Sequence, residues 1–300
     1  MLHNPFDRSG LASLDDIAAP LWHSVFSHLE SIQREFIAAQ PHCPDYPWPR
    51  DPLHNCIRVW EYPFVYHHLQ SQRRSMTARS LPRVVDLGSG ATFFPFAVAR
   101  LGYSVIAVDA DPRAKSSMDR AIGAVSAGAG AVTSLLSDAR SIALETESVD
   151  RVYCISVLEH ITDFQTVIAE VRRILRSGGL FVLTFDVDLS GNSELGPASY
   201  TQLMEALHVS FSLIYPEEVI HPLRVLTSDN SIYPMYPRRP ILDGLVTRLR
   251  HSLHCAHNRL RGRPLPPARL LASTYGACLR KHSSPKSDPE VGPAEPRQAV

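Results

Sequence analysis

Short, almost uninterrupted apolar runs recur along the middle of the chain and alternate with longer amphipathic stretches. These runs have the composition of strands that are buried on both faces of a sheet. They are Arg83–Leu87, Ser104–Val108, Val132–Leu136, Val149–Val157 and Leu180–Phe185. Strands that alternate with helices predict an α/β fold with a mostly parallel sheet and helices on both of its faces.

Apolar residues at intervals of three and four predict the helices that connect the strands. The clearest helix begins at a capping-box pattern, Thr162–Gln165, and is expected to end at Gly178–Gly179. Its apolar face is formed by Phe164, Val167, Ile168, Val171, Ile174 and Leu175. Further helices are expected over Leu21–Ile37, Ala97–Leu101, Ser116–Ala127 and Ala198–Val209.

The first 80 residues precede this alternation and predict an N-terminal helical cap. Residues 1–20 are polar and irregular, and the prolines within 41–52 predict an extended connector. A further helix is expected to have Pro63 in its first turn and to end at Leu69, with a linker behind it through Ser80.

The region after the fifth strand predicts an insertion over about 187–268, a last strand at Leu270–Leu279 and a disordered tail at 283–300. Ten basic residues face one acid, Asp243, within 238–281, so this segment carries a net charge of +9 (10 − 1). One interpretation is a solvated helix face and loop. The other is a surface for an anionic partner, such as a phosphate-bearing acceptor, lipid headgroups or RNA.

A glycine turn follows the first strand. Gly88 and Gly90 lack a Cβ atom where the backbone must turn tightly and let a ligand approach its N–H groups. The second strand ends in Asp109, which lies 109 − 90 = 19 residues past Gly90, the spacing of an acid that binds ribose hydroxyls. A dinucleotide fingerprint needs a small residue where Phe93 stands, so a nicotinamide or flavin cofactor is disfavoured.

The turn, Val-Asp-Leu-Gly-Ser-Gly, resembles motif I of the class I S-adenosylmethionine-dependent methyltransferases. Four later segments resemble the following motifs in the same order: Val108–Pro112, Leu135–Ala139, Val149–Ile161 and Arg176–Thr184. The resemblance covers about residues 81–186, roughly a third of the chain. Many relatives have a further glycine where Thr92 stands, so the methionine end of the cofactor is expected to be held somewhat differently here.

The resemblance implies a doubly wound, mostly parallel seven-stranded sheet whose last strand is antiparallel, within a core over 81–282. It also implies S-adenosyl-L-methionine as the cofactor. The implied cofactor residues are Gly88, Ser89 and Gly90 for the methionine part with Asp86 beneath them, Asp109 for the ribose hydroxyls, Asp138 for the adenine amine, and Ser156 at the tip of the fourth strand. Ala110 and Ala139, beside the two acids, are included in the implied cofactor site. Members of this family often build a substrate lid ahead of motif I. The side chains of Arg58, Trp60, Glu61 and Tyr62 therefore either face the substrate or belong to an amphipathic helix that packs on the sheet.

Methyl transfer needs a general base only where the acceptor must lose a proton. His160 is the leading candidate, because it follows the fourth strand and an imidazole titrates near neutral pH. Asp186 and Asp188 are weaker candidates, and His160 is equally compatible with a packed structural role. No Asn/Asp-Pro-Pro-aromatic motif follows strand four, which argues against the common amino-methyltransferases of nucleobases and glutamine. No Pro-Cys follows it as a C5-directed nucleophile, and Cys154 lies inside the apolar run. What remains is O- or C-methylation of a small molecule, a saccharide or a lipid-linked intermediate.

Composition limits the partners. Thirty basic residues balance thirty acidic ones, so the whole-chain charge gives no reason to propose nucleic acid. Five scattered cysteines indicate neither a disulfide framework nor a metal site. With no leader-like or membrane-spanning run, a cytoplasmic protein is expected. Two alternatives stay open: an RNA or protein methyltransferase that uses the basic 238–281 segment, and a non-catalytic scaffold that retains the fold.

Overall fold

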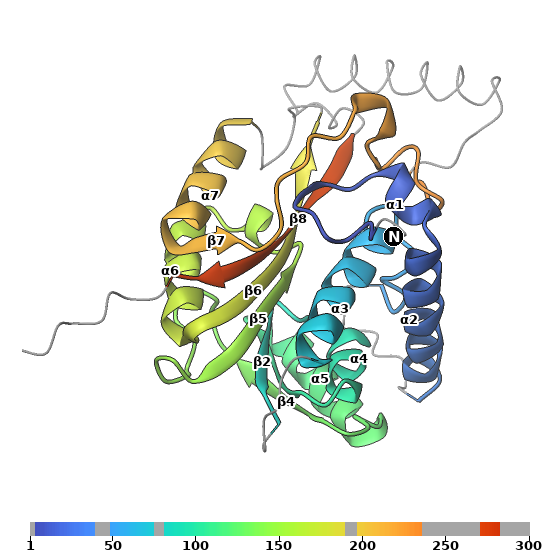
Figure 1. Cartoon of the computed structure of the whole chain (residues 1–300). Helices are drawn as coiled ribbons and strands as arrows, with labels where there is room; N and C mark the ends of the chain where they lie inside the picture. The colour runs from blue at the N-terminus through green and yellow to red at the C-terminus, as the bar shows by residue number, and fades with distance from the viewer. Residues whose placement is uncertain (1–3, 40–48, 75–80, 190–196, 236–270, 283–300) are drawn as a thin grey trace, which may run out of the picture.

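The computed structural model describes residues 4–39, 49–74, 81–189, 197–235 and 271–282 (Figure 1). Within them eight strands form one sheet in the order β1-β8-β6-β5-β2-β3-β4, and β7 also pairs with β8. The strands are β1 (Gly10–Leu11), β2 (Arg83–Leu87), β3 (Ser104–Asp109), β4 (Ala131–Leu136), β5 (Val149–Ile155), β6 (Leu175–Asp188), β7 (Phe211–Leu213) and β8 (Ala272–Lys281). The helices are α1 (Leu14–Ala18), α2 (Pro20–Ala39), α3 (Arg58–Arg74), α4 (Phe94–Arg100), α5 (Pro112–Ala124), α6 (Phe164–Ile174) and α7 (Pro197–Ser210), with short 3-10 turns η1 (Leu158–His160) and η2 (Pro222–Arg224).

The sheet confirms the expected doubly wound architecture. Strands β4, β3, β2, β5 and β6 pair in parallel, and β8 inserts antiparallel to β6. The sheet has eight strands rather than seven, because the outer edge of β8 pairs with β7 along one half and with β1 along the other. These two short strands cover a sheet edge that would otherwise expose unpaired backbone groups.

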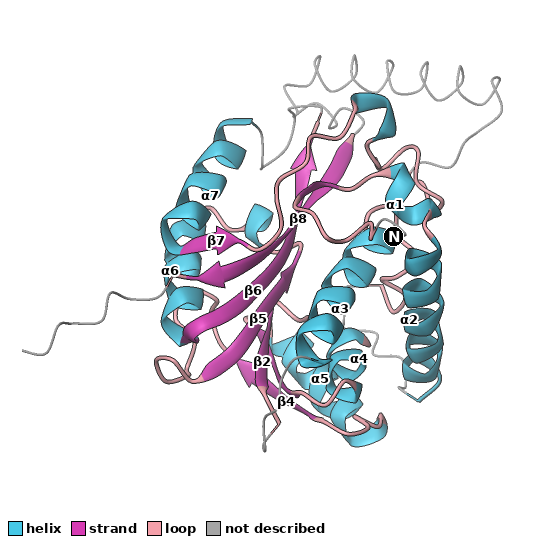
Figure 2. Ribbon diagram, in the orientation of Figure 1, coloured by secondary structure: helices cyan, strands magenta, loops and turns pink. Residues whose placement is uncertain are grey.

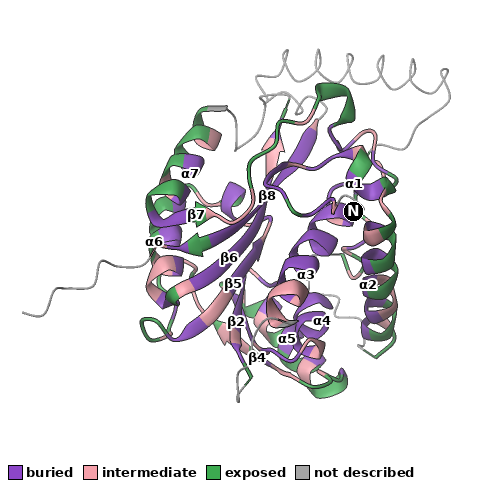
Figure 3. Ribbon diagram, viewed as in Figure 1, coloured by how far each residue is buried: buried purple, intermediate pink, exposed green. Residues whose placement is uncertain are grey.

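Helices cover both faces of the sheet, as Figure 2 shows. Helices α2, α3, α4 and α5 contribute to one buried apolar cluster, whereas α6 and α7 contribute to a second cluster on the opposite face. Figure 3 shows that buried residues are concentrated along the central strands and on the sides of the helices that face them. The sheet is therefore a layer between two cores, and its strand ends are free to form a site.

The N-terminal segment differs from the prediction in two ways. Residues 1–20 are not irregular, since β1 and α1 lie there, and α1 begins with a capping box formed by Ser13 and Asp16. Pro63 lies inside α3 rather than in its first turn. A proline has no N–H to donate to the carbonyl four residues earlier, which is that of Val59. The indole N–H of Trp22 on α2 donates to this carbonyl at 3.0 Å, so the helix continues without an orphaned acceptor.

Three other boundaries were wrong. The predicted linker from Gln70 begins later, because α3 continues to Arg74. Helix α6 is capped by Asp163, whose side chain accepts from the Thr166 N–H, and not by Thr162. It ends at Ile174, and the two glycines at 178 and 179 lie inside β6, where the register against β5 shifts.

Several predictions lie outside the described residues. The tail at 283–300, most of the basic segment, and residues 190–196 and 236–268 of the insertion belong to them. Across the described ranges, no helix is long and apolar enough to cross a bilayer. The same ranges contain no group of His, Cys, Asp or Glu residues arranged to hold a metal ion.

Candidate functional site

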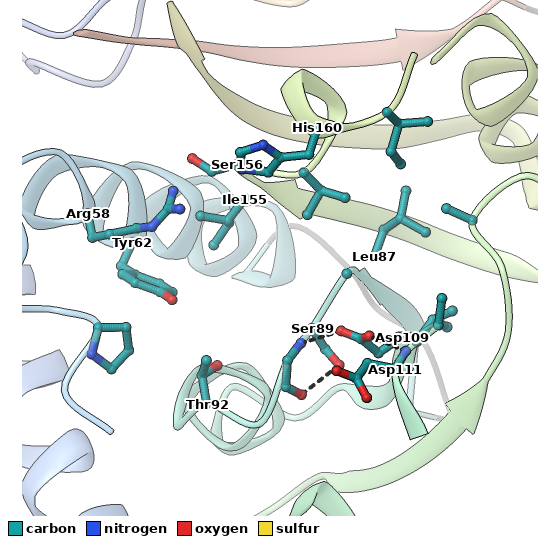
Figure 4. Close-up of a pocket in the computed structure, with 18 of the residues that line it drawn as sticks. Arg58, Tyr62, Leu87, Ser89, Thr92, Asp109, Asp111, Ile155, Ser156 and His160 are labelled. Atoms are coloured by element: carbon teal, nitrogen blue, oxygen red, sulfur yellow. Dashed lines mark hydrogen bonds between the residues drawn. The ribbon is translucent and has the colours of Figure 1, made fainter. Parts of the chain in front are cut away.

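A cavity of about 860 Å³ lies at the carboxyl ends of β2, β3 and β5. In an open α/β sheet this is the edge at which ligands bind. Figure 4 shows Arg58 and Tyr62 of α3 on one side of the cavity, Asp109 and Asp111 on the other, and Ser156 with His160 at a third position. Nearly all of the predicted cofactor residues line this cavity: Gly88, Ser89, Gly90, Asp109, Ala110, Asp138, Ala139 and Ser156.

The glycine turn is fixed by its neighbours. The N–H groups of Gly88 and Ser89 both donate to the Val108 carbonyl of β3, at 2.9 and 3.0 Å. Gly88 has a φ of +71°, and a Cβ atom there would lie 2.4 Å from Cγ2 of Val157. Both the positive φ and the close approach exclude a side chain at this position. The turn thus leaves the floor of the cavity open.

Asp109 connects the turn to the second strand. Its Oδ2 atom accepts from the Gly90 N–H at 2.8 Å, and its Oδ1 atom accepts from the Asp111 N–H at 2.8 Å. These two amides fix the orientation of the carboxylate, and each oxygen keeps a further lone pair. The carboxylate predicted to bind ribose is therefore held at the cavity wall with acceptor capacity to spare.

Asp138 lies at the open end of the cavity and is exposed. Its carboxylate accepts from the Arg140 guanidinium at 2.6 and 2.9 Å and from the Arg140 N–H at 2.8 Å. The hydrogen bonds from the Arg140 side chain lower the pKa of Asp138 to about 2. The carboxyl group is thus an anionic acceptor at every physiological pH.

Asp86 is the one predicted cofactor residue that does not line the cavity. It lies in β2 beneath the glycine turn and is buried. Burial raises its pKa to about 8. Asp86 is therefore separated from the cavity, in contrast to the other predicted cofactor residues.

The far end of the cavity is formed by N-terminal residues. Arg58 and Tyr62 of α3 line it, whereas Trp60 and Glu61 of the same helix are buried beside the sheet. The predicted connector contributes Pro49, Asp51 and Pro52 to the lining, and His54 and Asn55 line the cavity directly after it. The sequence indicated a proline-broken connector here but not its position, because nothing in its pattern shows which strand end it covers.

His54 fastens this connector to α2. Its ring nitrogens lie 2.6 Å from Oδ2 of Asp51 and 3.1 Å from Oε1 of Glu30. These two carboxylates raise the pKa of His54 against the opposing effect of partial burial. The wall of the cavity is therefore held to α2 by an ionisable contact.

The candidate bases lie at the ends of β5 and β6. His160 is exposed and lines the cavity, in η1 directly after β5. Ser156 is buried, lines the cavity and has a φ of +49°, a conformation that few residues other than glycine adopt. Asp186 and Asp188 are not in the lining. Cys154 is fully buried, and burial raises the pKa of its thiol, which makes it unreactive.

The cavity fits a nucleoside-sized cofactor. Its volume lies in the range of small-molecule sites, its floor is a side-chain-free turn, and a fixed carboxylate stands where ribose hydroxyls would bind. The two ends of the cavity differ: a glycine turn without side chains lies at one end, and an anionic acceptor, Asp138, lies at the other. The residues present fit an S-adenosylmethionine molecule.

Residues 85–183 match a family of known proteins described as a methyltransferase domain. An uncharacterized methyltransferase of Mycobacterium ulcerans is 31% identical over 134 residues, which are 44% of this chain and 49% of that protein. A second uncharacterized methyltransferase, from Mycobacterium sp. (strain JLS), is 34% identical over 119 residues, 39% of this chain and 44% of its own length. The matches thus span about half the length of these relatives. Among solved structures, a putative sarcosine dimethylglycine methyltransferase from Galdieria sulphuraria aligns with a TM-score of 0.47 and 17% identity, covering 73% of this chain and 85% of that one.

Proposed function

Because residues 85–183 form a methyltransferase domain of the class I S-adenosylmethionine-dependent family, we propose that the chain transfers a methyl group to an oxygen or carbon atom of a small-molecule, saccharide or lipid-linked acceptor. The observation that carries this proposal is the cavity at the carboxyl ends of β2, β3 and β5, with the Gly90–Asp109 hydrogen bond in its wall. S-adenosylmethionine is the cofactor of this family, and it supplies an electrophilic methyl group on a sulfonium when bound.

In this proposal the two halves of the cavity have separate tasks. The glycine turn holds the methionine part, Asp109 the ribose hydroxyls and Asp138 the adenine amine. The acceptor enters the half lined by Arg58, Tyr62 and the connector. Such a division places the acceptor against the end of β5, where Ser156 and His160 lie.

The charge of the acceptor half supports an uncharged acceptor. The Arg58 guanidinium donates to the buried carboxylate of Glu61, and nearby carboxylates, Glu61 foremost, raise its pKa above the ordinary value. A cation that is already paired attracts an anionic substrate weakly. A hydroxyl group or an acidic carbon fits this wall better than a carboxylate or a phosphate.

The proposal is tested by calorimetric titration of the protein with S-adenosylmethionine and S-adenosylhomocysteine. The wild type is expected to bind both, because their ribose hydroxyls reach the same carboxylate. Asp109→Ala is expected to weaken binding at least tenfold, since it removes both the ribose acceptor and the partner of the Gly90 N–H.

Asp119→Ala is the matched control. Asp119 pairs with Lys115 on the exposed side of α5 and does not line the cavity, so the affinity should not change. A wild type that binds neither compound would remove the cofactor from the proposal and leave a non-catalytic role for the fold.

A further inference from the structure

Three carboxyl groups and one guanidinium meet behind the cavity wall, beside the candidate bases. Glu61 and Glu159 are buried, and Asp186 is half-buried at the end of β6. Glu61 accepts from the Arg58 guanidinium, and Glu159 accepts from the Asp186 N–H at 3.1 Å. Only Arg58 among them lines the cavity.

Ser156 connects this cluster to the cavity. Its hydroxyl oxygen lies 2.7 Å from Oε1 of Glu61 and 3.1 Å from Oδ1 of Asp186. A hydroxyl group carries one hydrogen and can donate it to only one of these oxygens at a time. When Ser156 donates to Glu61, its own lone pairs face Asp186, and a proton on Asp186 can be donated back to it.

The protons of the cluster are not shared equally. Glu61 also accepts from the Thr274 hydroxyl at 2.9 Å, so three donors stabilise its carboxylate form. Burial, followed by the charge of Asp186, raises the pKa of Glu159 well above its ordinary value, and its Oε2 atom has no hydrogen-bond partner. These surroundings favour the protonated form of Glu159.

Asp186 is the member that can change its charge. Burial and the neighbouring Glu61 carboxylate raise its pKa to about 6 against the lowering effects of Arg58, the Ser156 hydroxyl and His160. Burial, followed by the charge of Asp186, raises the pKa of the nearby Cys56 thiol to about 11. At pH 7 to 8 Asp186 is thus mostly ionised, and it has a pKa close to the working pH, as an efficient proton acceptor should.

We propose that Ser156 is a catalytic residue that takes the proton of the acceptor hydroxyl and passes its own proton to Asp186. This inference rests on the methyl transfer proposed above. The electron pair of the acceptor O–H bond forms the new O–CH₃ bond. The methyl–sulfur bond breaks with its electrons on sulfur, and the proton ends on the Asp186 carboxylate, from which solvent removes it after the transfer.

The backbone at Ser156 agrees with this role. A non-glycine residue with a φ of +49° is strained, and such strain persists where the surroundings enforce it. The Ser156 N–H donates to the Thr184 carbonyl of β6 at 3.0 Å, which holds the residue against that strand. Ser156 thereby lines the cavity while its hydroxyl group stays within hydrogen-bond distance of both carboxylates.

The first test needs no acceptor. Carboxyl resonances of the ¹³C-labelled, ligand-free protein are followed by NMR against pH in the wild type, Asp186→Asn and Ser156→Ala. One resonance is expected to titrate near pH 6, to vanish in Asp186→Asn and to move in Ser156→Ala. Asp150→Asn, an acid paired with Arg176 at the opposite end of β5, should leave it unchanged. The proposal is wrong if no carboxyl titrates between pH 5 and 7, or if Ser156→Ala leaves that titration in place.

The second test uses catechol as the probe and measures transfer of a labelled methyl group at saturating cofactor. Ser156→Ala and Asp186→Asn should each lower the rate about 100-fold or more and remove the acidic limb of the pH profile. S-adenosylmethionine affinity should stay unchanged in Asp186→Asn, because Asp186 does not line the cavity, and this separates the proton transfer from the cofactor site. If the acidic limb of the pH profile is lost in His160→Asn instead, His160 is the base and the proposal is overturned.

The wild type could also bind the cofactor and leave catechol unmethylated. That result would count against the hydroxyl acceptor of the proposed function, and the NMR titration of the carboxyl groups would then decide whether Asp186 accepts the proton.

Discussion

Asp86 carries an acidic group in an apolar environment beneath the glycine turn. Burial raises its pKa to about 8, whereas an unfolded aspartate titrates near 3.9. Between these pH values the native state holds a proton that the unfolded state has lost. The stability that this group contributes is therefore complete below about pH 4 and is lost as the pH rises to about 8.

Asp86→Asn removes this dependence, because an amide does not titrate. The free energy of unfolding of the wild type, relative to that of the variant, is expected to fall with a slope of up to about 1.4 kcal/mol per pH unit between pH 5 and 7. Urea denaturation at several pH values measures it. Asp138→Asn is the control, since its pKa of about 2 places its titration below this window. Parallel curves for the wild type and Asp86→Asn would show that Asp86 is ionised in the native state.

At the scale of elements, α3 packs closely against β8 at Gly276, which has no side chain. A Cβ atom on Gly276 would lie 2.6 Å from Cη2 of Trp60 and 3.0 Å from Cε1 of Phe64. Both rings are buried and stacked on each other, with centroids 4.6 Å apart. Gly276→Ala should therefore destabilise the protein by about 1–3 kcal/mol, because overpacked side chains leave their preferred rotamers.

Gly123→Ala on α5 is the matched substitution, since nothing lies within 4 Å of its added Cβ atom. It should leave stability unchanged or raise it by about 0.5–1 kcal/mol, as alanine favours a helix over glycine. Thermal and urea denaturation of both variants provide the comparison. Equal effects at the two positions would mean that α3 can move away from β8 at little cost.

The sequence predicted elements that are specified locally. The five parallel strands and α6 follow from their own apolar periodicity, and Asp109 follows from its spacing to the glycine turn. Short β1 could not be predicted, because two residues carry no period and their pairing depends on the distant β8. Pro63 predicted a helix start, because a proline further inside a helix normally leaves one backbone carbonyl without its hydrogen bond. The donor that satisfies this carbonyl, the Trp22 indole N–H, comes from another helix and could not be read from the local sequence.

The residues of the candidate site also differ in whether the sequence could predict them. The residues predicted to bind the cofactor lie within single motifs, so the family resemblance could name them, and all of them except Asp86 line one cavity. The cluster around Ser156 joins Glu61 with Asp186, which are 186 − 61 = 125 residues apart, and sequence separation of this kind leaves no local pattern. The sequence left Glu61 between two interpretations, a side chain that faces the substrate and a member of an amphipathic helix that packs on the sheet.

At the scale of the whole molecule, the N-terminal segment is bound into the fold by a buried ion pair. Oδ2 of Asp16 accepts from the Arg8 guanidinium at 2.5 Å, from the Ser13 N–H at 2.9 Å and from the Trp60 indole N–H at 2.8 Å. Arg8 and Asp16 are both almost fully buried. One carboxylate thus joins α1, the segment before β1 and α3, and α3 in turn covers the sheet and the cavity.

Arg8→Met should destabilise the protein by about 3–5 kcal/mol, because the substitution leaves the Asp16 carboxyl buried without its counter-charge. The free energy of unfolding from urea denaturation measures the loss. Lys115→Met is the control, as the Lys115–Asp119 pair is solvent-exposed and contributes little. If the unpaired charge causes the loss, Asp16→Asn in the Arg8→Met background should recover part of it. A double variant no more stable than Arg8→Met would instead assign the loss to the packing of the arginine side chain, and the N-terminal segment would then be held by its apolar contacts and by the β1–β8 pairing alone.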